Sequence, residues 1–148
     1  MNVALLGTGL LGQAVAARLH ATGHRISAYN RSPEKTLALR QQGIRIASTA
    51  AEAIAAAEVV ILLLADAAAI RAVLLDPSTS QALGGRTIIQ MGTIGPSESC
   101  SIGEDIERLG GQYLEAPVLG SIAEAKAGTL LIMVGATPER YATWSPLL

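Results

Sequence analysis

The sequence contains no phenylalanine and a single cysteine, and only 3% of its residues are aromatic. The lone thiol of Cys100 excludes an internal disulfide and favours a reducing compartment. Neither sign of charge dominates. The 11 basic and 12 acidic residues give a formal net charge of -1, which argues against a nucleic-acid partner or a polybasic membrane surface. His20 and His24 are not paired with Cys100 or a carboxylate at ligand spacing, so we expect no metal site.

The chain also lacks a long hydrophobic run. The longest strongly apolar stretch, residues 59–65, is far too short to cross a bilayer. The first residues carry no basic region ahead of their apolar run, which indicates a buried strand rather than a signal peptide. A G-x-S-x-G motif is missing as well, so a serine-hydrolase triad is not supported. Together these absences predict a cytoplasmic protein with no membrane partner.

What the sequence does contain is a regular alternation of short apolar runs and helical patterns. Half of its 148 residues are hydrophobic, enough for one domain over residues 1–148. Strands are predicted at Asn2–Leu6, Arg25–Tyr29, 44–46, 59–64, 87–91, Gln112–Glu115 and 130–134. Helices are predicted from the first glycine-rich turn to Gly23, from Pro33 to Gly43, over 48–57, 67–75 and 96–109, and from Pro138 onward, with a loop at 76–85. This order predicts a doubly wound α/β fold, a mostly parallel sheet with helices on both faces.

A glycine-rich turn follows the first predicted strand. It matches G-x-G-x-x-G with Gly7, Thr8, Gly9, Leu10, Leu11 and Gly12. The pattern alone is weak, but here it ends a strand and opens a helix, which is the context of a dinucleotide-binding loop. The first glycine allows the tight turn, the second lets backbone amides approach a pyrophosphate, and the third lets helix and strand pack closely. A glycine-rich turn that binds no ligand is the alternative.

The second predicted strand ends where NAD-binding proteins usually carry an acid. That acid binds the ribose hydroxyls and would repel a 2′-phosphate. Here the chain has Asn30, Arg31 and Ser32, and no carboxylate before Glu34. An amide, a guanidinium and a hydroxyl can all donate to phosphate, so we expect NADP(H) to be preferred over NAD(H). The alternative is that Arg31 is a solvated cation and Ser32 only caps a helix.

Four segments, in this order, resemble the β-hydroxyacid dehydrogenase family, which includes 3-hydroxyisobutyrate dehydrogenases and, more distantly, 6-phosphogluconate dehydrogenases and imine reductases. They are VALLGTGLLGQAVAARLHATGH, YNRS, MGTIGP and YLEAPVLGSIAEAKAGTLLIMVG. The resemblance covers essentially the whole chain and implies a Rossmann-type NAD(P)-binding domain. It also implies an oxidoreductase that transfers hydride between the cofactor and a small carbonyl, hydroxy-acid or imine substrate.

The resemblance implies roles for residues beyond the glycine loop. Leu64 and Ala65 match positions on the adenosine and pyrophosphate side of the cofactor, although Pro is usual where Ala65 stands. Thr93 matches the residue beside the nicotinamide and substrate. A turn hydroxyl bonded to its own backbone is the alternative for Thr93. Gly120 and Ser121 match the substrate loop, where backbone N–H groups can hold a carboxylate.

Leu119 departs from the family pattern within this substrate loop. Hydroxy-acid members usually have Ser there, so Leu removes a donor and adds an apolar wall. A buried apolar site does not compensate for the desolvation of a carboxylate or hydroxyl. A less polar carbonyl or an imine is therefore an open alternative to a hydroxy-acid substrate.

The resemblance also implies a C-terminal, all-helical domain that is absent from this chain. In the family, that domain supplies a lysine as proton donor or acceptor and forms the homo-oligomer. The two lysines here, Lys35 and Lys126, do not match its position, and Lys126 is expected to be solvated. We therefore expect no catalytic residue in this chain and cofactor binding without turnover. An apolar surface left uncovered would allow weak self-association.

Two further functions stay open at this stage. A non-catalytic nucleotide-sensing or protein-interaction module would keep the fold and also lack the lysine. A deazaflavin-type reductase would share the glycine loop and the Asn-Arg strand end, although the EAPVLGS segment counts against it.

Overall fold

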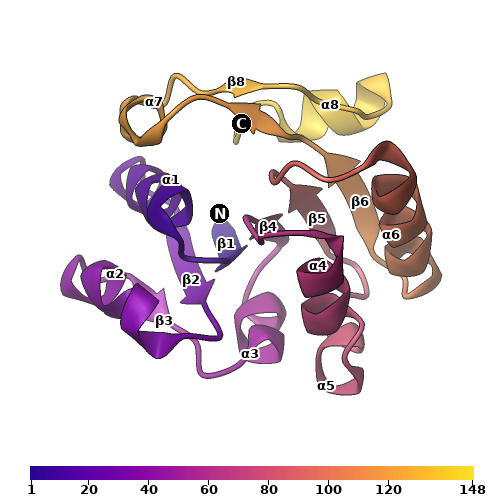
Figure 1. Ribbon diagram of the computed structural model, residues 1–148, viewed down its shortest axis with the longest axis horizontal. Helices are drawn as coiled ribbons and strands as arrows, with labels where there is room; N and C mark the ends of the chain where they lie inside the picture. The colour runs from indigo at the N-terminus through magenta and orange to yellow at the C-terminus, as the bar shows by residue number, and fades with distance from the viewer.

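A six-stranded parallel sheet forms the centre of the molecule (Figure 1). The computed structural model describes every residue from Met1 to Leu148. The strands are, in spatial order, β3 (Arg45–Ile46), β2 (Arg25–Tyr29), β1 (Asn2–Leu6), β4 (Val59–Leu62), β5 (Thr87–Gln90) and β6 (Gln112–Glu115). The chain winds outward from β1 to β3 and then returns to place β4 on the other side of β1. Open α/β sheets bind ligands at such a switch point, beyond the carboxyl ends of the strands.

Helices cover both faces of the sheet, as the alternation of apolar runs predicts. One face carries α1 (Leu10–Ala21), α2 (Leu37–Gln41) and α7 (Ile122–Ala127), and the other carries α3 (Ala50–Ala55), α4 (Ala67–Leu74) and α6 (Pro96–Arg108). Side chains of β1 alternate between the two cores. Val3 and Leu5 pack on the α1 face, and Ala4 and Leu6 pack on the α3 face. The doubly wound α/β fold is therefore confirmed.

The end of the chain lies on the α1 side of the sheet (Figure 1). There β7 (Val118–Leu119) and β8 (Leu131–Ile132) form an antiparallel pair, and α7 between them packs against α1. The last helix is α8 (Pro138–Trp144). None of the helices in the fold has the length and apolar character that a membrane span requires.

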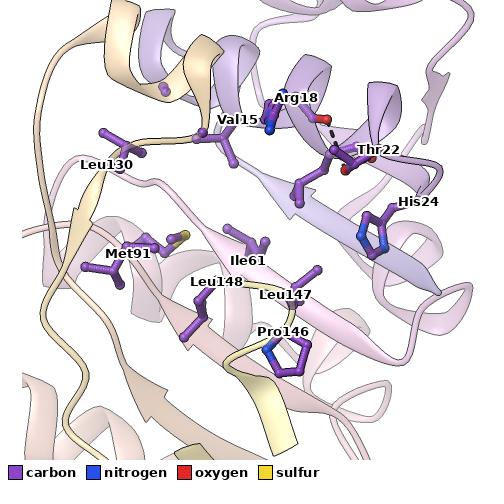
Figure 2. Close-up of a pocket in the computed structure, with 14 residues that line it drawn as sticks. Val15, Arg18, Thr22, His24, Ile61, Met91, Leu130, Pro146, Leu147 and Leu148 are labelled. Atoms are coloured by element: carbon purple, nitrogen blue, oxygen red, sulfur yellow. Dashed lines mark hydrogen bonds between the residues drawn. The ribbon is translucent and has the colours of Figure 1, made fainter.

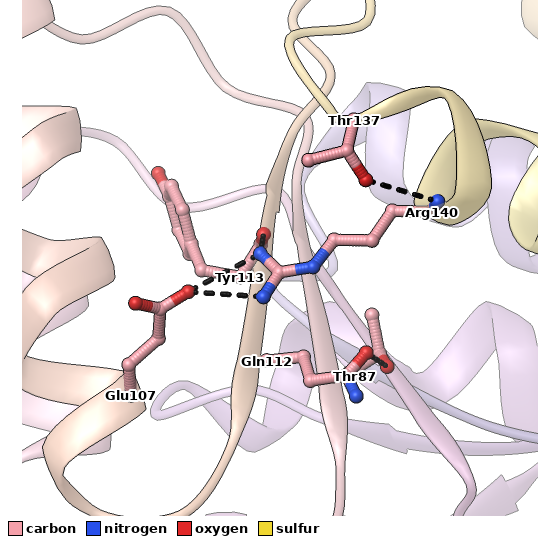
Figure 3. A network of polar contacts seen from close by, with 6 residues as sticks. All are labelled: Thr87, Glu107, Gln112, Tyr113, Thr137 and Arg140. Carbon is pink, nitrogen blue, oxygen red and sulfur yellow. Dashed lines mark hydrogen bonds and ion pairs between the residues drawn. The ribbon is translucent and has the colours of Figure 1, made fainter.

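One arginine joins α8 to the edge of the sheet (Figure 3). The Arg140 guanidinium donates to Glu107 Oε1 from both of its terminal nitrogens, at 3.2 Å each, and to the carbonyl oxygen of Tyr113, also at 3.2 Å. The backbone N–H of Arg140 donates to Thr137 Oγ1, which caps α8.

Burial raises the pKa of the Tyr113 phenol above its ordinary value, and its hydroxyl lies 2.9 Å from Ser99 Oγ.

The predicted loop at 76–85 contains a short helix, α5 (Pro77–Ser80), so that prediction was wrong in part. Asp76 accepts a hydrogen bond from the Ser78 N–H at 2.9 Å and Pro77 occupies the first turn. An Asp-Pro pair is a helix-start signal, and it outweighs the low helix propensity of the serines and threonine that follow.

The strand predicted at 130–134 forms only over Leu131–Ile132, and its partner is β7 rather than the parallel sheet. Helix α7 was not predicted. A capping box starts it, because the Ser121 N–H donates to Glu124 Oε2 at 2.7 Å and the Ser121 hydroxyl accepts from the Ala123 N–H. Gly128, in the left-handed conformation at φ 73°, ends it.

The remaining predicted elements are found, with small shifts at their ends. The helix expected from Pro33 begins as a 3-10 turn, η1 (Pro33–Thr36), before α2. Ser32 precedes it but its side chain makes no capping bond, so the expected cap is absent. Thr49 does cap α3, accepting from the Glu52 N–H at 3.0 Å.

Replacing Asp105 should reduce stability in a pH-dependent way. The Asp105 carboxylate on α6 is 16% exposed and pairs with Arg71 of α4 and with Arg108. The hydrogen bond from Arg71 is the main cause that lowers the pKa of Asp105. A lowered native pKa stabilises the fold above the unfolded pKa of about 3.9, and this contribution is lost as pH falls through the native value. Urea unfolding should therefore find Asp105→Asn less stable than wild type at neutral pH.

The difference between Asp105→Asn and wild type should shrink as pH falls below the native pKa. Glu104→Gln, an exposed position on the same helix, is the matched control and should leave stability unchanged. If the difference in stability between Asp105→Asn and wild type stays the same in acid, the charge of the Asp105 carboxylate is not its cause.

Candidate cofactor site

A cleft of about 640 Å³ opens at the carboxyl ends of β1, β2 and β4. It lies at the switch point of the sheet, beside the turn between β1 and α1. Of the residues predicted to bind a cofactor, the cleft is lined by Gly7, Gly9, Asn30, Arg31, Ser32, Leu64 and Ala65. Segments that follow the first, second and fourth predicted strands therefore meet in one place.

The glycines of the β1–α1 turn have separate steric roles. A Cβ on Gly7, at φ +100°, would lie 2.2 Å from the carbonyl oxygen of Leu63, and a Cβ on Gly12 would lie 2.0 Å from the carbonyl oxygen of Gly7. Both positions are closed to a side chain by neighbouring backbone. A Cβ on Gly9 would meet nothing within 4 Å. Gly9 leaves open space on the cleft side of the turn, where a ligand can approach the backbone.

The N-terminus of α1 suits an anion. Gly9 is its N-cap and supplies no side-chain bond, and the first turn holds no acidic residue. The N–H groups of Leu10 and Leu11 therefore lie at an uncapped helix end that carries partial positive charge. Beside them the hydroxyl of Thr8 is completely buried and has no hydrogen-bond partner. These features fit a pyrophosphate held by backbone amides.

The residues after β2 place two cations in the same cleft. Asn30 Oδ1 accepts from the Ser32 N–H at 2.9 Å, which shapes the turn that presents Arg31. Lys35 of η1 also lines the cleft, and neither Arg31 nor Lys35 forms an ion pair. Lys35 was not among the predicted cofactor-binding residues, although its position in the predicted helix that starts at Pro33, four residues after Arg31, was a usable signal.

Gln13 of α1 links the glycine turn to the segment that carries Arg31 and Lys35. Its side-chain amide donates to the carbonyl oxygen of Thr8 at 3.1 Å and to that of Lys35 at 3.2 Å. The bonds join the β1–α1 turn to η1. No motif marks Gln13, because both of its acceptors are backbone atoms of other segments.

The far end of the cleft is more apolar and holds one acid. Leu64, Ala69 and Val73 contribute its apolar wall from the end of β4 and from α4. Asp76 lies at the start of α5 and its carboxylate is engaged by Ser78. The hydrogen bond from the Ser78 hydroxyl is the main cause that lowers the pKa of Asp76.

The residues predicted near the substrate do not line this cleft. Thr93 is exposed on the loop between β5 and α6. Leu119 is 65% exposed at the end of β7, and Gly120 follows at φ +145°. The Ser121 N–H, expected to hold a substrate carboxylate, already donates to Glu124. The substrate roles of these residues, and the cofactor roles of Thr8, Leu10, Leu11, Gly12 and Thr93, stay predictions.

A second cavity of about 390 Å³ lies between α1, α7 and the last residues of the chain (Figure 2). Leu147 and Leu148 reach into it opposite Val15 of α1. Arg18 and His24 are its titratable side chains, and none of the predicted site residues lines it. Nowhere in the fold do three His, Cys, Asp or Glu side chains gather in an arrangement that could hold a metal ion.

Comparison with known families agrees with this geometry. The profile of the family described as the NAD binding domain of 6-phosphogluconate dehydrogenase matches residues 2–148. The chain belongs to this family. It is an NAD-binding domain of the type found in hydroxyacid dehydrogenases and imine reductases. The predicted family membership and the nicotinamide cofactor class are thereby confirmed.

Relatives of this NAD-binding domain carry several names. The chain is 33% identical to a 3-hydroxyisobutyrate dehydrogenase of Pseudomonas aeruginosa over 99% of its own length and 50% of that protein. It is 31% identical to the cytokine-like nuclear factor N-PAC of Danio rerio, over 95% of the chain and 31% of that protein. The structure of an imine reductase of Streptomyces aurantiacus superimposes with a TM-score of 0.92, at 26% identity, over 99% of this chain and 51% of that one. The chain thus spans about half or less of the relatives it matches.

Alanine at two of the glycines should separate binding from folding. Gly9→Ala adds a methyl group to open space in the cleft, so we expect the free energy of unfolding to change by less than about 1 kcal/mol while cofactor affinity falls by about tenfold or more. Gly12→Ala drives a methyl group into backbone and should destabilise the fold by about 2 kcal/mol or more.

Calorimetric titration with NADPH and NADH, together with thermal unfolding, measures both effects. Gly23→Ala, at a positive φ remote from the cleft, is a control for backbone strain alone. Full cofactor affinity in a folded Gly9→Ala variant would show that the ligand does not pass over this glycine.

Proposed function

We propose that this domain binds NADP(H) in preference to NAD(H), as the cofactor half of an oxidoreductase. The observation that carries the proposal is the presence of Arg31 and Lys35, both free of ion pairs, in the same cleft as the glycine turn. No carboxylate stands at the end of β2, where one would favour the unphosphorylated ribose.

Charge complementarity supports this preference. A 2′-phosphate adds close to two negative charges at the ribose, and a guanidinium can bind it through paired hydrogen bonds. Both cations sit at the protein surface, where they keep their hydration until a phosphate replaces it. Asp76, the acidic residue that lines the cleft, lies at the start of α5 and is hydrogen-bonded to Ser78. It forms no ion pair with Arg31 or Lys35.

Different residues of the domain would bind different parts of the cofactor. The uncapped amides at the start of α1 would hold the pyrophosphate, and Arg31, Ser32 and Lys35 would hold the 2′-phosphate. Leu64 and Ala65 would contact the adenosine side, and Thr93 would lie beside the nicotinamide. The cofactor, when bound, supplies the hydride, and the protein contributes its position and the exclusion of water.

We infer a small carbonyl, hydroxy-acid or imine compound as the substrate of the whole protein. The loop of Leu119, Gly120 and Ser121 would face it. Leu119 offers no hydrogen-bond donor, and the Ser121 N–H is taken by Glu124, so this loop provides less for a carboxylate than a serine- and glycine-rich loop would. These two features favour an imine or a less polar carbonyl.

Removing the guanidinium should abolish the cofactor preference. We expect wild type to bind NADPH more tightly than NADH, and Arg31→Ala to weaken NADPH binding by about 10- to 100-fold, since charge-assisted hydrogen bonds to phosphate are lost. NADH affinity should change little. Calorimetric titration of each cofactor measures the four constants.

Two variants sharpen the comparison. Lys35→Ala should act in the same direction as Arg31→Ala, whereas Arg40→Ala, an exposed cation of α2 outside the cleft, should bind both cofactors like wild type. Equal affinity of wild type for NADPH and NADH would end the proposal.

We propose further that these 148 residues bind cofactor without turnover. Lys35 lines the cofactor cleft and Lys126 is exposed on α7, and neither matches the position of the family's catalytic lysine. Spectrophotometry of the purified chain with NADPH and a panel of small aldehydes and cyclic imines should show no sustained NADPH oxidation above the rate without protein. Sustained, protein-dependent oxidation would contradict the proposal.

A non-catalytic nucleotide-binding or interaction module is the second candidate. The similarity to N-PAC, a protein named as a nuclear factor, favours it. A nucleotide-sensing module would also bind the cofactor, whereas a protein-interaction module does not require it. The two candidate functions differ in whether a proton donor supplied by further chain completes a reaction.

A further inference from the structure

Gln90 is a completely buried polar side chain at the end of β5. Its neighbours in the strand, Ile88 and Ile89, belong to the two apolar cores, one on each face of the sheet. A carboxamide in such surroundings is costly unless its hydrogen bonds are made. Gln90 makes them with a single residue, Gly92, two positions further along the chain.

The contact between Gln90 and Gly92 has two hydrogen bonds in opposite directions. Gln90 Nε2 donates to the carbonyl oxygen of Gly92 at 2.9 Å, and the Gly92 N–H donates to Gln90 Oε1 at 2.8 Å. The Gln90 side chain therefore bonds both the N–H and the carbonyl of Gly92, as a neighbouring strand would in a sheet. The loop that leaves β5 is closed on itself before it reaches Thr93.

This loop is pressed against the end of β4. A Cβ on Gly92 would lie 3.1 Å from the carbonyl oxygen of Leu64, which lines the cofactor cleft. The carbonyl oxygen of Leu63, one residue earlier, is the atom that a Cβ on Gly7 would strike. Backbone contacts therefore run from the glycine turn, across the end of β4, to the loop that carries Thr93.

We propose that Gln90 is a positioning residue for the nicotinamide end of the cofactor site. It holds the Gly92 backbone against the carbonyl oxygen of Leu64, which lines the cleft, and thereby fixes the start of the loop that carries Thr93. The proposal rests on the proposed function, because it assumes that a nicotinamide cofactor occupies the cleft with its reactive end towards Thr93. In this proposal Gln90 supports the nicotinamide end, whereas Arg31 and Lys35 hold the adenosine end.

Two ligands separate this role from a general effect on the fold. Adenosine 2′,5′-bisphosphate contains the adenosine end alone, and NADPH contains both ends. Gln90→Leu keeps the volume of the side chain and removes both hydrogen bonds. We expect the Kd for NADPH to rise about tenfold while the Kd for the bisphosphate stays within about twofold of wild type. The emission of the bound reduced nicotinamide should also shift towards that of the free cofactor.

Gln90→Glu provides a second variant with a pH readout. A protonated glutamic acid can donate to the Gly92 carbonyl and accept from its N–H, as the carboxamide does, whereas the carboxylate cannot donate. Burial raises the pKa of a carboxyl group in this position. NADPH affinity relative to wild type should therefore be close to normal in acid and should fall as pH rises through that pKa. The relative affinity for the bisphosphate should not follow pH.

The controls distinguish this proposal from the one it rests on. Gln41→Leu, an exposed position on α2, should match wild type with both ligands, and thermal unfolding should report that each variant is folded. If wild type binds neither ligand, the proposed cofactor function fails. If wild type binds the bisphosphate as tightly as NADPH, or if the variants lose both ligands in parallel or neither, the role of Gln90 is overturned.

Discussion

The close approach of backbone segments at the carboxyl edge of the sheet is the constraint on which the site depends. Gly7 touches the carbonyl of Leu63, Gly12 touches the carbonyl of Gly7, and Gly92 lies close to the carbonyl of Leu64. The contacts of Gly7 and Gly12 leave no room for a side chain, and Gly7 brings the turn before α1 directly against the end of β4. Because backbone forms the base of the cleft, amide groups and a helix N-terminus are exposed there. Anions bind to such a surface.

The rest of the site adds charge and shape to that floor. Arg31 and Lys35 bring positive charge from the end of β2, and Gln13 holds their segment to the glycine turn through two carbonyl oxygens. Gln90 holds the loop on the opposite side through Gly92. Both glutamines bond only to backbone. They shape the site without contributing charge, which leaves the electrostatic preference to the two cations.

Much of the architecture was predictable because it is encoded locally. The period of apolar residues distinguishes the strands from the helices, and all six sheet strands were expected within a residue or two of their ends, as Asn2–Leu6 and Gln112–Glu115 illustrate. Local patterns were weaker after Glu115. There the short strands β7 and β8 pair with each other, and a capping box starts α7 in a stretch that looks merely polar. Strands of two residues carry too little periodicity to be recognised.

The sequence by itself determined the layered fold, the glycine turn and the absence of an acid after β2, since each follows from residue types at consecutive positions. Tertiary structure alone decided that Arg31 and Lys35 line one cleft with the glycine turn and with the end of β4, and that Gln13 bonds to the backbone of η1. The physical reason is that a local pattern specifies backbone conformation and burial, whereas a contact between side chain and distant backbone depends on how whole elements pack. That packing is a property of the complete core and cannot be assigned to any one segment.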